Sequence, residues 1–135
     1  MTNAAMDKQL VVTVSNQVGA LSEIANVVAS AGINMIAICA YAVDNRGVIM
    51  FVSDNNDQAR KLLQAKKYDI REEEVVVISV DNKPGALQSI VQKISQARID
   101  LNLLYGSVDK SGKTSRVVFI SEDNKAVLTV LKMLK

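Results

Sequence analysis

Val80-Asp81-Asn82-Lys83-Pro84-Gly85-Ala86-Leu87 is the second occurrence of a short element that determines how this chain is divided. The first occurrence lies 66 residues earlier and reads Val14-Ser15-Asn16-Gln17-Val18-Gly19-Ala20-Leu21. When residues 16–34 are aligned with residues 82–100, seven of nineteen positions are identical without a gap. An internal repeat of this kind indicates two copies of one supersecondary unit, so we expect two units of similar fold.

The first copy predicts a βαββαβ order of elements. Short runs rich in β-branched residues predict strands over 9–14, 33–43, 48–53 and 68–74. Apolar residues recur at helical spacing after Gly19 and again around residues 59–63, which predicts a helix in each interval. This order belongs to the ferredoxin-like plan. The predicted fold class is therefore α+β, with two ferredoxin-like units in tandem and antiparallel sheets.

The second copy repeats the order but stops one element short. Strands are predicted over 75–80, 99–108 and 116–120, and helices over 87–97 and 127–134. By the register of the first copy, the last strand of the second unit is missing. We therefore expect units over residues 9–74 and 75–135, with an unpaired sheet edge in the second unit that a dimer partner would cover.

Composition excludes several classes of function. The net charge of +2 is too small to indicate nucleic acid or an anionic membrane as a partner. The N-terminus does not resemble a signal peptide and no apolar stretch is long enough to span a membrane, so a cytoplasmic protein is expected. One cysteine and no histidine remove the usual nucleophile pairs and zinc sites. We expect no metal, no cofactor and no enzymatic activity.

The ferredoxin-like plan hosts many unrelated functions, and three of them leave residues that are missing here. An RNA-recognition motif needs aromatic residues where this chain has Val48, Met50 and Ser53. A metal chaperone needs two closely spaced cysteines, but Cys39 stands alone. An acylphosphatase-like enzyme needs an arginine in a phosphate-binding loop, and the loops at 16–19 and 82–85 contain none.

The remaining pattern resembles the ACT domain, the small-molecule-sensing module of amino-acid metabolism. The resemblance covers residues 9–135 and rests on N-x-x-G-A-L, followed about thirteen residues later by Gly32-Ile33-Asn34 or Arg98-Ile99-Asp100. The second copy matches more closely, because Pro84 stands where the family often has proline. In ACT domains that bind amino acids, the ligand usually lies between two paired domains, with the loop of one facing the second strand of the other.

The resemblance therefore implies ligand contacts from two loops and two strand starts. The candidate ligand-binding residues are Asn82, Lys83, Pro84, Gly85, Ala86, Leu87, Asn34, Met35, Ile36, Asn16, Gln17, Val18, Gly19, Ala20, Leu21, Asp100 and Leu101. The loop at 82–87, set against Asn34, is expected to form the better amino-acid site, since its counterpart at 16–21 faces Asp100. Serine-regulated members carry a His two residues before the loop Asn. This chain has Val14 and Val80 there, so it departs from the serine-binding pattern.

Physical chemistry supports the loops as sites but leaves an alternative open. Each loop ends at a helix N-terminus, where free N–H groups and the helix dipole favour a carboxylate. Asn16 and Asn82 can offer both a donor and an acceptor to a zwitterion. Asparagine before a helix is also an excellent N-cap whether or not a ligand binds. Leu21 and Leu87 are expected to face the core.

The predicted function is a stand-alone regulatory protein that senses an amino acid or similar small metabolite and signals through a homodimer or a partner. The alternative is an interaction subunit that binds no small molecule and modulates an enzyme or regulator of amino-acid metabolism. Thermal-shift screening against the twenty amino acids distinguishes the two.

Overall fold

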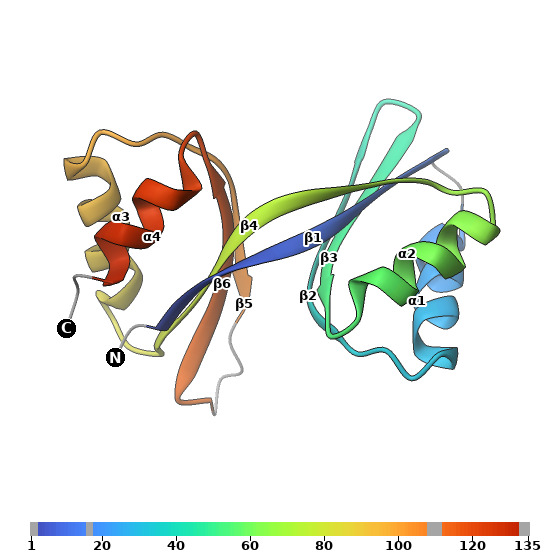
Figure 1. Cartoon of the computed structure of the whole chain (residues 1–135), viewed down its shortest axis with the longest axis horizontal. Coiled ribbons are helices and arrows are strands. Elements are labelled where there is room, and N and C mark those ends of the chain that lie inside the picture. Colours follow the sequence, from blue (N-terminus) through green and yellow to red (C-terminus); the bar gives the residue numbers. More distant parts are fainter. Residues whose placement is uncertain (1–2, 16–17, 108–111, 133–135) are drawn as a thin grey trace. The chain divides into compact units, whose positions relative to one another are not determined.

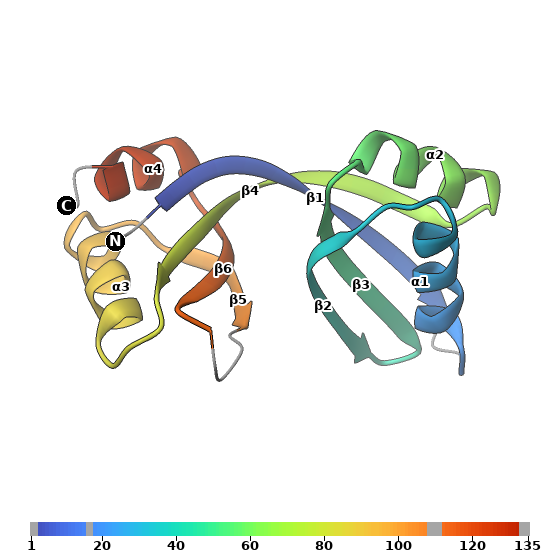
Figure 2. The same ribbon diagram turned by 90° about the horizontal axis from the view of Figure 1, so that it is seen from below.

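The computed structural model describes residues 3–15, 18–107 and 112–132 of the chain (Figures 1 and 2). Its contacts divide them into two compact units: residues 8–73 form the first, and residues from 74 onward together with 3–7 form the second. This division differs from the predicted ranges 9–74 and 75–135 in assigning the N-terminal residues to the second unit. The strand that contains residues 73 and 74 is continuous, as the absence of a linker in the sequence indicates.

The first unit contains the predicted βαββαβ order. Its elements are β1 (Asn3–Ser15, from residue 8 onward), α1 (Ala20–Ser30), β2 (Met35–Val43), β3 (Arg46–Ser53), α2 (Asn56–Ala65) and the first part of β4 (Asp69–Asp81). The strand order is β2-β3-β1-β4, and β3 pairs antiparallel with both β1 and β2. The strand β2 is therefore one edge of this unit.

The second unit has the same arrangement, with one strand supplied from the start of the chain. Its elements are the rest of β4, α3 (Ala86–Gln96), β5 (Leu101–Ser107), β6 (Thr114–Ser121) and α4 (Asn124–Lys132). No strand follows α4 among the described residues, as the sequence predicts. Residues 3–7 of β1 lie next to β4 instead, giving the order β1-β4-β6-β5. The prediction that this edge is unpaired is wrong, because sequence reasoning did not identify residues 3–8 as strand.

Each unit has its own apolar core between one sheet face and its two helices (Figure 2). In the first unit, Leu10, Val12 and Phe51 of the sheet are fully buried against Ile24 and Leu63 of the helices. The second core is built from Val76, Ile78, Val80, Ile90, Ile94, Val117, Phe119, Val127 and Leu131, with Ala4 and Met6 of β1 packed against it. The alternation of sheet residues and the helical spacing of apolar residues thus bury the expected faces.

An irregularity in β5 determines which of its side chains face the helices. The register shifts between Leu101 and Leu103, and afterwards Leu104 pairs with Phe119 and Gly106 with Val117. Paired residues share a sheet face, so Leu104 and Gly106 lie on the same face as the core. Strand β2 has the equivalent shift between Met35 and Ala37, and Ile38 pairs with Phe51.

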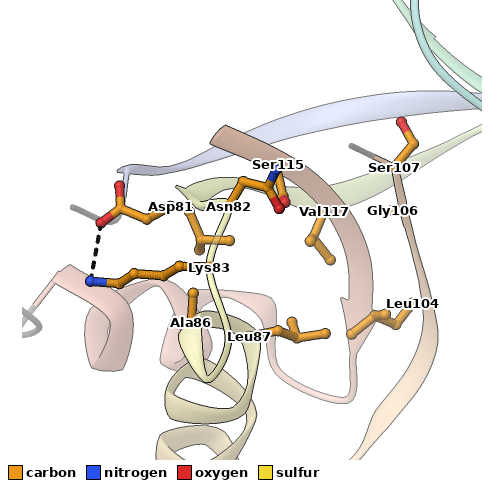
Figure 3. Close-up of a pocket in the computed structure, with 11 residues that line it drawn as sticks. Asp81, Asn82, Lys83, Ala86, Leu87, Leu104, Gly106, Ser107, Ser115 and Val117 are labelled. Atoms are coloured by element: carbon orange, nitrogen blue, oxygen red, sulfur yellow. Dashed lines mark ion pairs between the residues drawn. The ribbon is translucent and has the colours of Figure 1, made fainter. Parts of the chain in front are cut away.

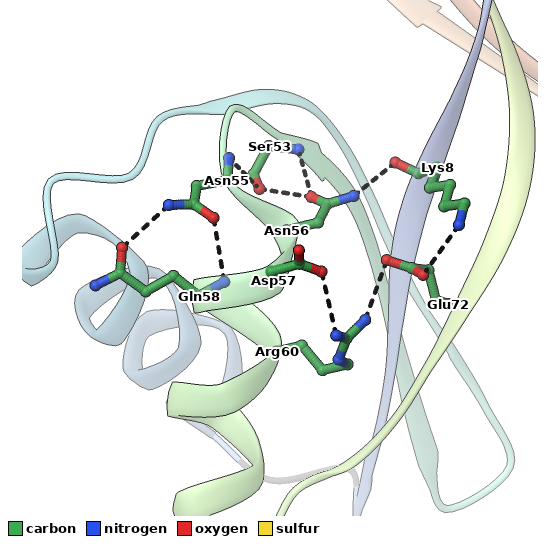
Figure 4. Close-up of polar contacts among 8 residues, drawn as sticks. All are labelled: Lys8, Ser53, Asn55, Asn56, Asp57, Gln58, Arg60 and Glu72. Atoms are coloured by element: carbon green, nitrogen blue, oxygen red, sulfur yellow. Dashed lines mark hydrogen bonds and ion pairs between the residues drawn. The ribbon is translucent and has the colours of Figure 1, made fainter.

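A polar motif that sequence analysis missed is also repeated and fixes the start of α2 and α4. In the first unit, Asn56 Oδ1 accepts hydrogen bonds from the backbone N–H and the hydroxyl of Ser53, while its Nδ2 donates to the Lys8 carbonyl (Figure 4). In the second unit, Asn124 makes the same three bonds with Ser121 and the Glu74 carbonyl. Each asparagine therefore connects two strands to the start of a helix.

Candidate functional site

The loop between β4 and α3 leaves the first turn of α3 without a side-chain cap. Gly85 is the N-cap residue and lies in the left-handed region, with φ of 85° and ψ of −10°. Asn82 does not cap the helix: its Nδ2 donates to the Gly112 carbonyl at 3.0 Å, and its N–H donates to the Lys113 carbonyl at 2.9 Å. The reading of Asn82 as an N-cap is therefore wrong. The uncapped helix start carries the positive end of the dipole.

A groove of about 340 Å³ begins at this loop and lies entirely within the second unit (Figure 3). Its lining residues are Val80, Asp81, Asn82, Lys83, Ala86, Leu87, Leu104, Gly106, Ser107, Ser115 and Val117. They come from the end of β4, the start of α3, the end of β5 and the start of β6. The volume is at the lower end of the range for small-molecule pockets.

The polar groups of the groove are concentrated at the loop. Lys83 Nζ lies 3.8 Å from Asp81 Oδ2, and both side chains are partly exposed (Figure 3). Such a pair contributes little to stability in water. A cation, a carboxylate and a helix N-terminus without a side-chain cap at one end of a groove can together bind the charged groups of a zwitterion.

The first unit has a narrower counterpart of the same groove. It has a volume of about 210 Å³ and is lined by Val14, Ala20, Leu21, Ala40, Tyr41, Ala42, Gly47 and Ile49. By the repeat, Ala40 stands at the position of Gly106 and Tyr41 at the position of Ser107. The helix start is similar, since Gly19 caps α1 with φ of 92° and no side-chain bond. Both grooves thus lie beside a helix that begins at a glycine without a side-chain cap, but they differ in volume and in lining residues.

Comparison with known proteins identifies the repeated unit. The family model described as an ACT domain pair matches residues 5–135. The chain belongs to the ACT domain pair family. The resemblance inferred from the two loops is confirmed, as is the α+β class with tandem ferredoxin-like units. ACT domains are regulatory modules.

Solved structures with the same fold include protein BT0572 of Bacteroides thetaiotaomicron, at 27% identity and a TM-score of 0.88 over 96% of this chain and 88% of that one. The ligand-free regulatory subunit of aspartate kinase from Thermus thermophilus is 15% identical, with a TM-score of 0.68 over 96% and 94%. The corresponding subunit from Thermus flavus is 13% identical, with a TM-score of 0.66 over 97% and 94%. At these identities the Thermus subunits show a shared fold. No curated protein matches the chain.

Not all of the predicted residues line the groove of the second ACT unit. Of the loop at 82–87, Asn82, Lys83, Ala86 and Leu87 contribute, and the neighbouring Pro84 and Gly85 are exposed. In the first ACT unit, Ala20 and Leu21 line the counterpart groove. Asn16 and Gln17 lie outside the described residues. The expectation that Leu21 and Leu87 face the core is wrong, because they are 43% and 41% exposed.

The starts of the second strands lie at the opposite end of each unit from its own loop. The backbone N–H of Asn34 donates to Asp54 Oδ1, and the N–H of Asp100 donates to Glu122 Oε1, which ties each strand start to the end of the strand beside it. Met35 and Leu101 pack against the cores of their units. The structure thus does not bring Asn34, Met35, Ile36, Asp100 or Leu101 to the loop of the same unit.

The groove also contains residues that sequence reasoning missed. Leu104, Gly106 and Val117 contribute because of the register between β5 and β6, and Ser115 lies at the start of β6. Alternation along β5 could have placed Leu104 and Gly106 on one face, but the irregularity after Leu101 reverses that face relative to the strand start. The available signal in the sequence was the repeat itself, which sets an apolar residue, Ile38 or Leu104, at the same position of both copies.

A separate polar pocket of about 580 Å³ lies on the other side of the loop in the first ACT unit, where Val18, Gly19, Glu23, Lys67 and Tyr68 are among its lining residues. A hydrogen bond to the Glu23 carboxylate, together with burial and the charge of Glu23, raises the pKa of Tyr68 from 10.0 to about 12. The Tyr68 ring also packs against the core of this unit. The pair therefore ties the residue just before β4 to α1.

The described part of the chain contains no helix long and apolar enough to cross a membrane. In the same residues, no three side chains of the Asp, Glu, Cys or His type gather as metal ligands. The acidic run at 72–74 is instead engaged in ion pairs: Glu72 contacts Lys8 and Arg60, and Glu73 contacts Arg71.

Proposed function

We propose that this protein is a regulatory sensor that binds an amino acid in the groove of its second ACT unit. The observation that carries the proposal is the groove itself, which joins an uncapped helix start and the polar residues Asn82 and Lys83 to apolar walls. The helix start and Lys83 favour the ligand's carboxylate, and Asp81 favours its ammonium group. We propose no catalytic role for any residue and a cytoplasmic location.

The signal would arise by linkage between ligand binding and assembly. A ligand shifts the equilibrium between two arrangements by as much as its affinity for them differs. The strand starts at 34–36 and 100–101 lie far from the loop of their own unit, so a second copy of the chain could bring such a strand start to a ligand at the loop. A bound amino acid that bridges a loop and such a strand start would favour the paired arrangement. The assembled form would be a homodimer or a complex with a regulated enzyme of amino-acid metabolism. The Thermus proteins, which share the fold, are regulatory subunits of such an enzyme, aspartate kinase.

A matched pair of glycine variants tests the site. Gly85 and Gly19 both have positive φ and both have open space where a Cβ would lie, so aspartate brings the same strain and the same charge to each helix start. Gly85→Asp places a carboxylate where the ligand's carboxylate would bind. We expect it to abolish amino-acid binding in titration calorimetry, while Gly19→Asp leaves the affinity unchanged.

The parent protein would first be screened by thermal shift against the twenty amino acids, where a bound ligand raises the melting temperature. Unchanged affinity in Gly85→Asp would show that the loop at 82–87 is not the site. Circular dichroism of both variants controls for folding.

A second candidate function is that of an interaction subunit without a small ligand. It is favoured by β2, an edge strand without a single charged residue, on which Ile38, Tyr41 and Val43 are exposed. An uncharged edge is a template for pairing with another chain. If none of the twenty amino acids raises the melting temperature and the protein is a dimer in solution, this function is supported over sensing.

A further inference from the structure

The side-chain end of the groove in the second unit is apolar. Leu87 and Leu104 are 41% and 40% exposed and point toward each other across the groove (Figure 3). Val80 and Val117, both nearly fully buried, contribute apolar surface to the same groove. Exposed apolar side chains on both walls of a concavity indicate a surface that is covered when the site is in use.

Charge in this groove is confined to its loop end. Among the described lining residues, Asp81 and Lys83 are the only charged ones, and they face each other beside the loop. A ligand with a charged side chain would place that charge between Leu87 and Leu104 without a partner, at a large cost in desolvation. A ligand whose only charges are those of its backbone matches the distribution: the charged groups at the loop and an apolar tail between the leucines.

The counterpart groove of the first unit is smaller and has a different apolar lining. Leu21 lines it at the position of Leu87, whereas Ile38, at the position of Leu104, is exposed but is not among its lining residues. The volume is about 210 Å³ there and about 340 Å³ in the second unit. Tyr41 replaces Ser107 and Ala40 replaces Gly106, so bulkier residues border the first groove. Lys83 and Asp81, which supply the charges, have Gln17 and Ser15 as counterparts in the sequence.

We infer that the groove of the second unit selects amino acids with an apolar side chain, such as valine or leucine, over those with a polar or charged one. This inference rests on the proposed function and adds the class of ligand to it. Leu104 and Leu87 hold the side chain by apolar contact, and the loop holds the charged groups. The counterpart groove of the first unit does not take this ligand, because its volume is smaller and no charged residue is among its lining residues.

The test compares near-isosteric ligands on the unmodified protein. By titration calorimetry, valine should bind at least about tenfold tighter than threonine, and leucine at least about tenfold tighter than asparagine. If threonine or asparagine binds as tightly as its apolar partner, the inference on ligand class is overturned while amino-acid sensing stands. If none of the twenty amino acids binds, the proposed function fails and this inference with it.

A matched pair of variants locates the apolar contact. Leu104→Gln should weaken leucine binding about tenfold by placing a polar group against the ligand's side chain. Ile38→Gln makes the same kind of change at the equivalent position of the first unit and should leave the affinity unchanged. Both positions are exposed enough to accept glutamine. Loss of binding in Ile38→Gln but not in Leu104→Gln would assign the ligand to the first unit and overturn the inference.

Discussion

At the scale of single residues, the loop before α3 depends on Gly85 and Asn82, which have separate tasks. Gly85 supplies the positive φ that begins the helix, and Asn82 ties the loop to the Gly112 and Lys113 carbonyls before β6. Asn82 precedes Ala86, the first residue of α3, by four positions, and asparagine close to a helix start is a common N-cap on sequence grounds. In the structure it bonds to the segment before β6 instead, which leaves the start of α3 without a side-chain cap.

Tyr68 provides a residue-scale prediction of pH dependence. Its pKa is raised to about 12, so the folded state holds this proton more tightly than the unfolded state does. The stabilisation is therefore complete below about pH 10 and is lost as the pH rises toward 12. Ultraviolet absorbance at 295 nm during alkaline titration should show one of the three tyrosines ionising late.

Two variants check this assignment. Tyr68→Phe should remove the late step, and Glu23→Gln should move it to lower pH by removing the carboxylate that causes the shift. A late step that persists in Tyr68→Phe would assign the shifted group to another tyrosine.

At the scale of elements, Asn56 and Asn124 join separate parts of each unit. Removing the Asn124 side chain leaves the part-buried Ser121 N–H and the exposed Glu74 carbonyl without this partner. We expect Asn124→Ala to lower the free energy of unfolding by about 1–3 kcal/mol. Urea denaturation measures this loss.

The neighbouring Lys125 is exposed, so Lys125→Ala should change stability by less than about 0.5 kcal/mol and serves as the control. Equal stability of Asn124→Ala and the parent would mean that water replaces all three hydrogen bonds.

The sequence predicts the elements well because each has a strong periodic pattern, and it fails where no local pattern exists. The βαββαβ order follows from apolar spacing and from the loops at Gly19 and Gly85. Residues 3–8, Asn-Ala-Ala-Met-Asp-Lys, have neither β-branched residues nor a turn signal, so their strand depends on tertiary pairing. The candidate groove is partly predictable for the same reason: its loop has a motif, while Leu104 and Ser115 enter through the pairing of β5 with β6.

At the scale of the whole molecule, the second unit depends on both ends of the described chain. Met6 packs against its core, whereas Ala5 points away and is exposed. Met6→Asp should destabilise the second unit by about 2 kcal/mol or more, because it brings a carboxylate to an apolar contact.

Hydrogen exchange measured by mass spectrometry should show faster exchange in β6 and α4 of the Met6→Asp variant, while β3 keeps its protection. Ala5→Asp adds the same charge on the exposed side and should leave both regions unchanged. Uniform loss of protection in both units would mean that they unfold as one cooperative body.

The contribution of residues 3–7 to the second unit also has a consequence for synthesis on the ribosome. The first unit has all its strands once residue 73 has emerged, and domains generally fold as they are completed. Residues 3–7 are translated earlier, but the strands of the second unit with which they form a sheet lie within residues 74–121 and are translated later. During that interval they are an unpaired strand segment, and Asp7 and Lys8 place charges where pairing with a foreign edge would begin. The second unit, which includes residues 3–7, is thus completed after the first unit.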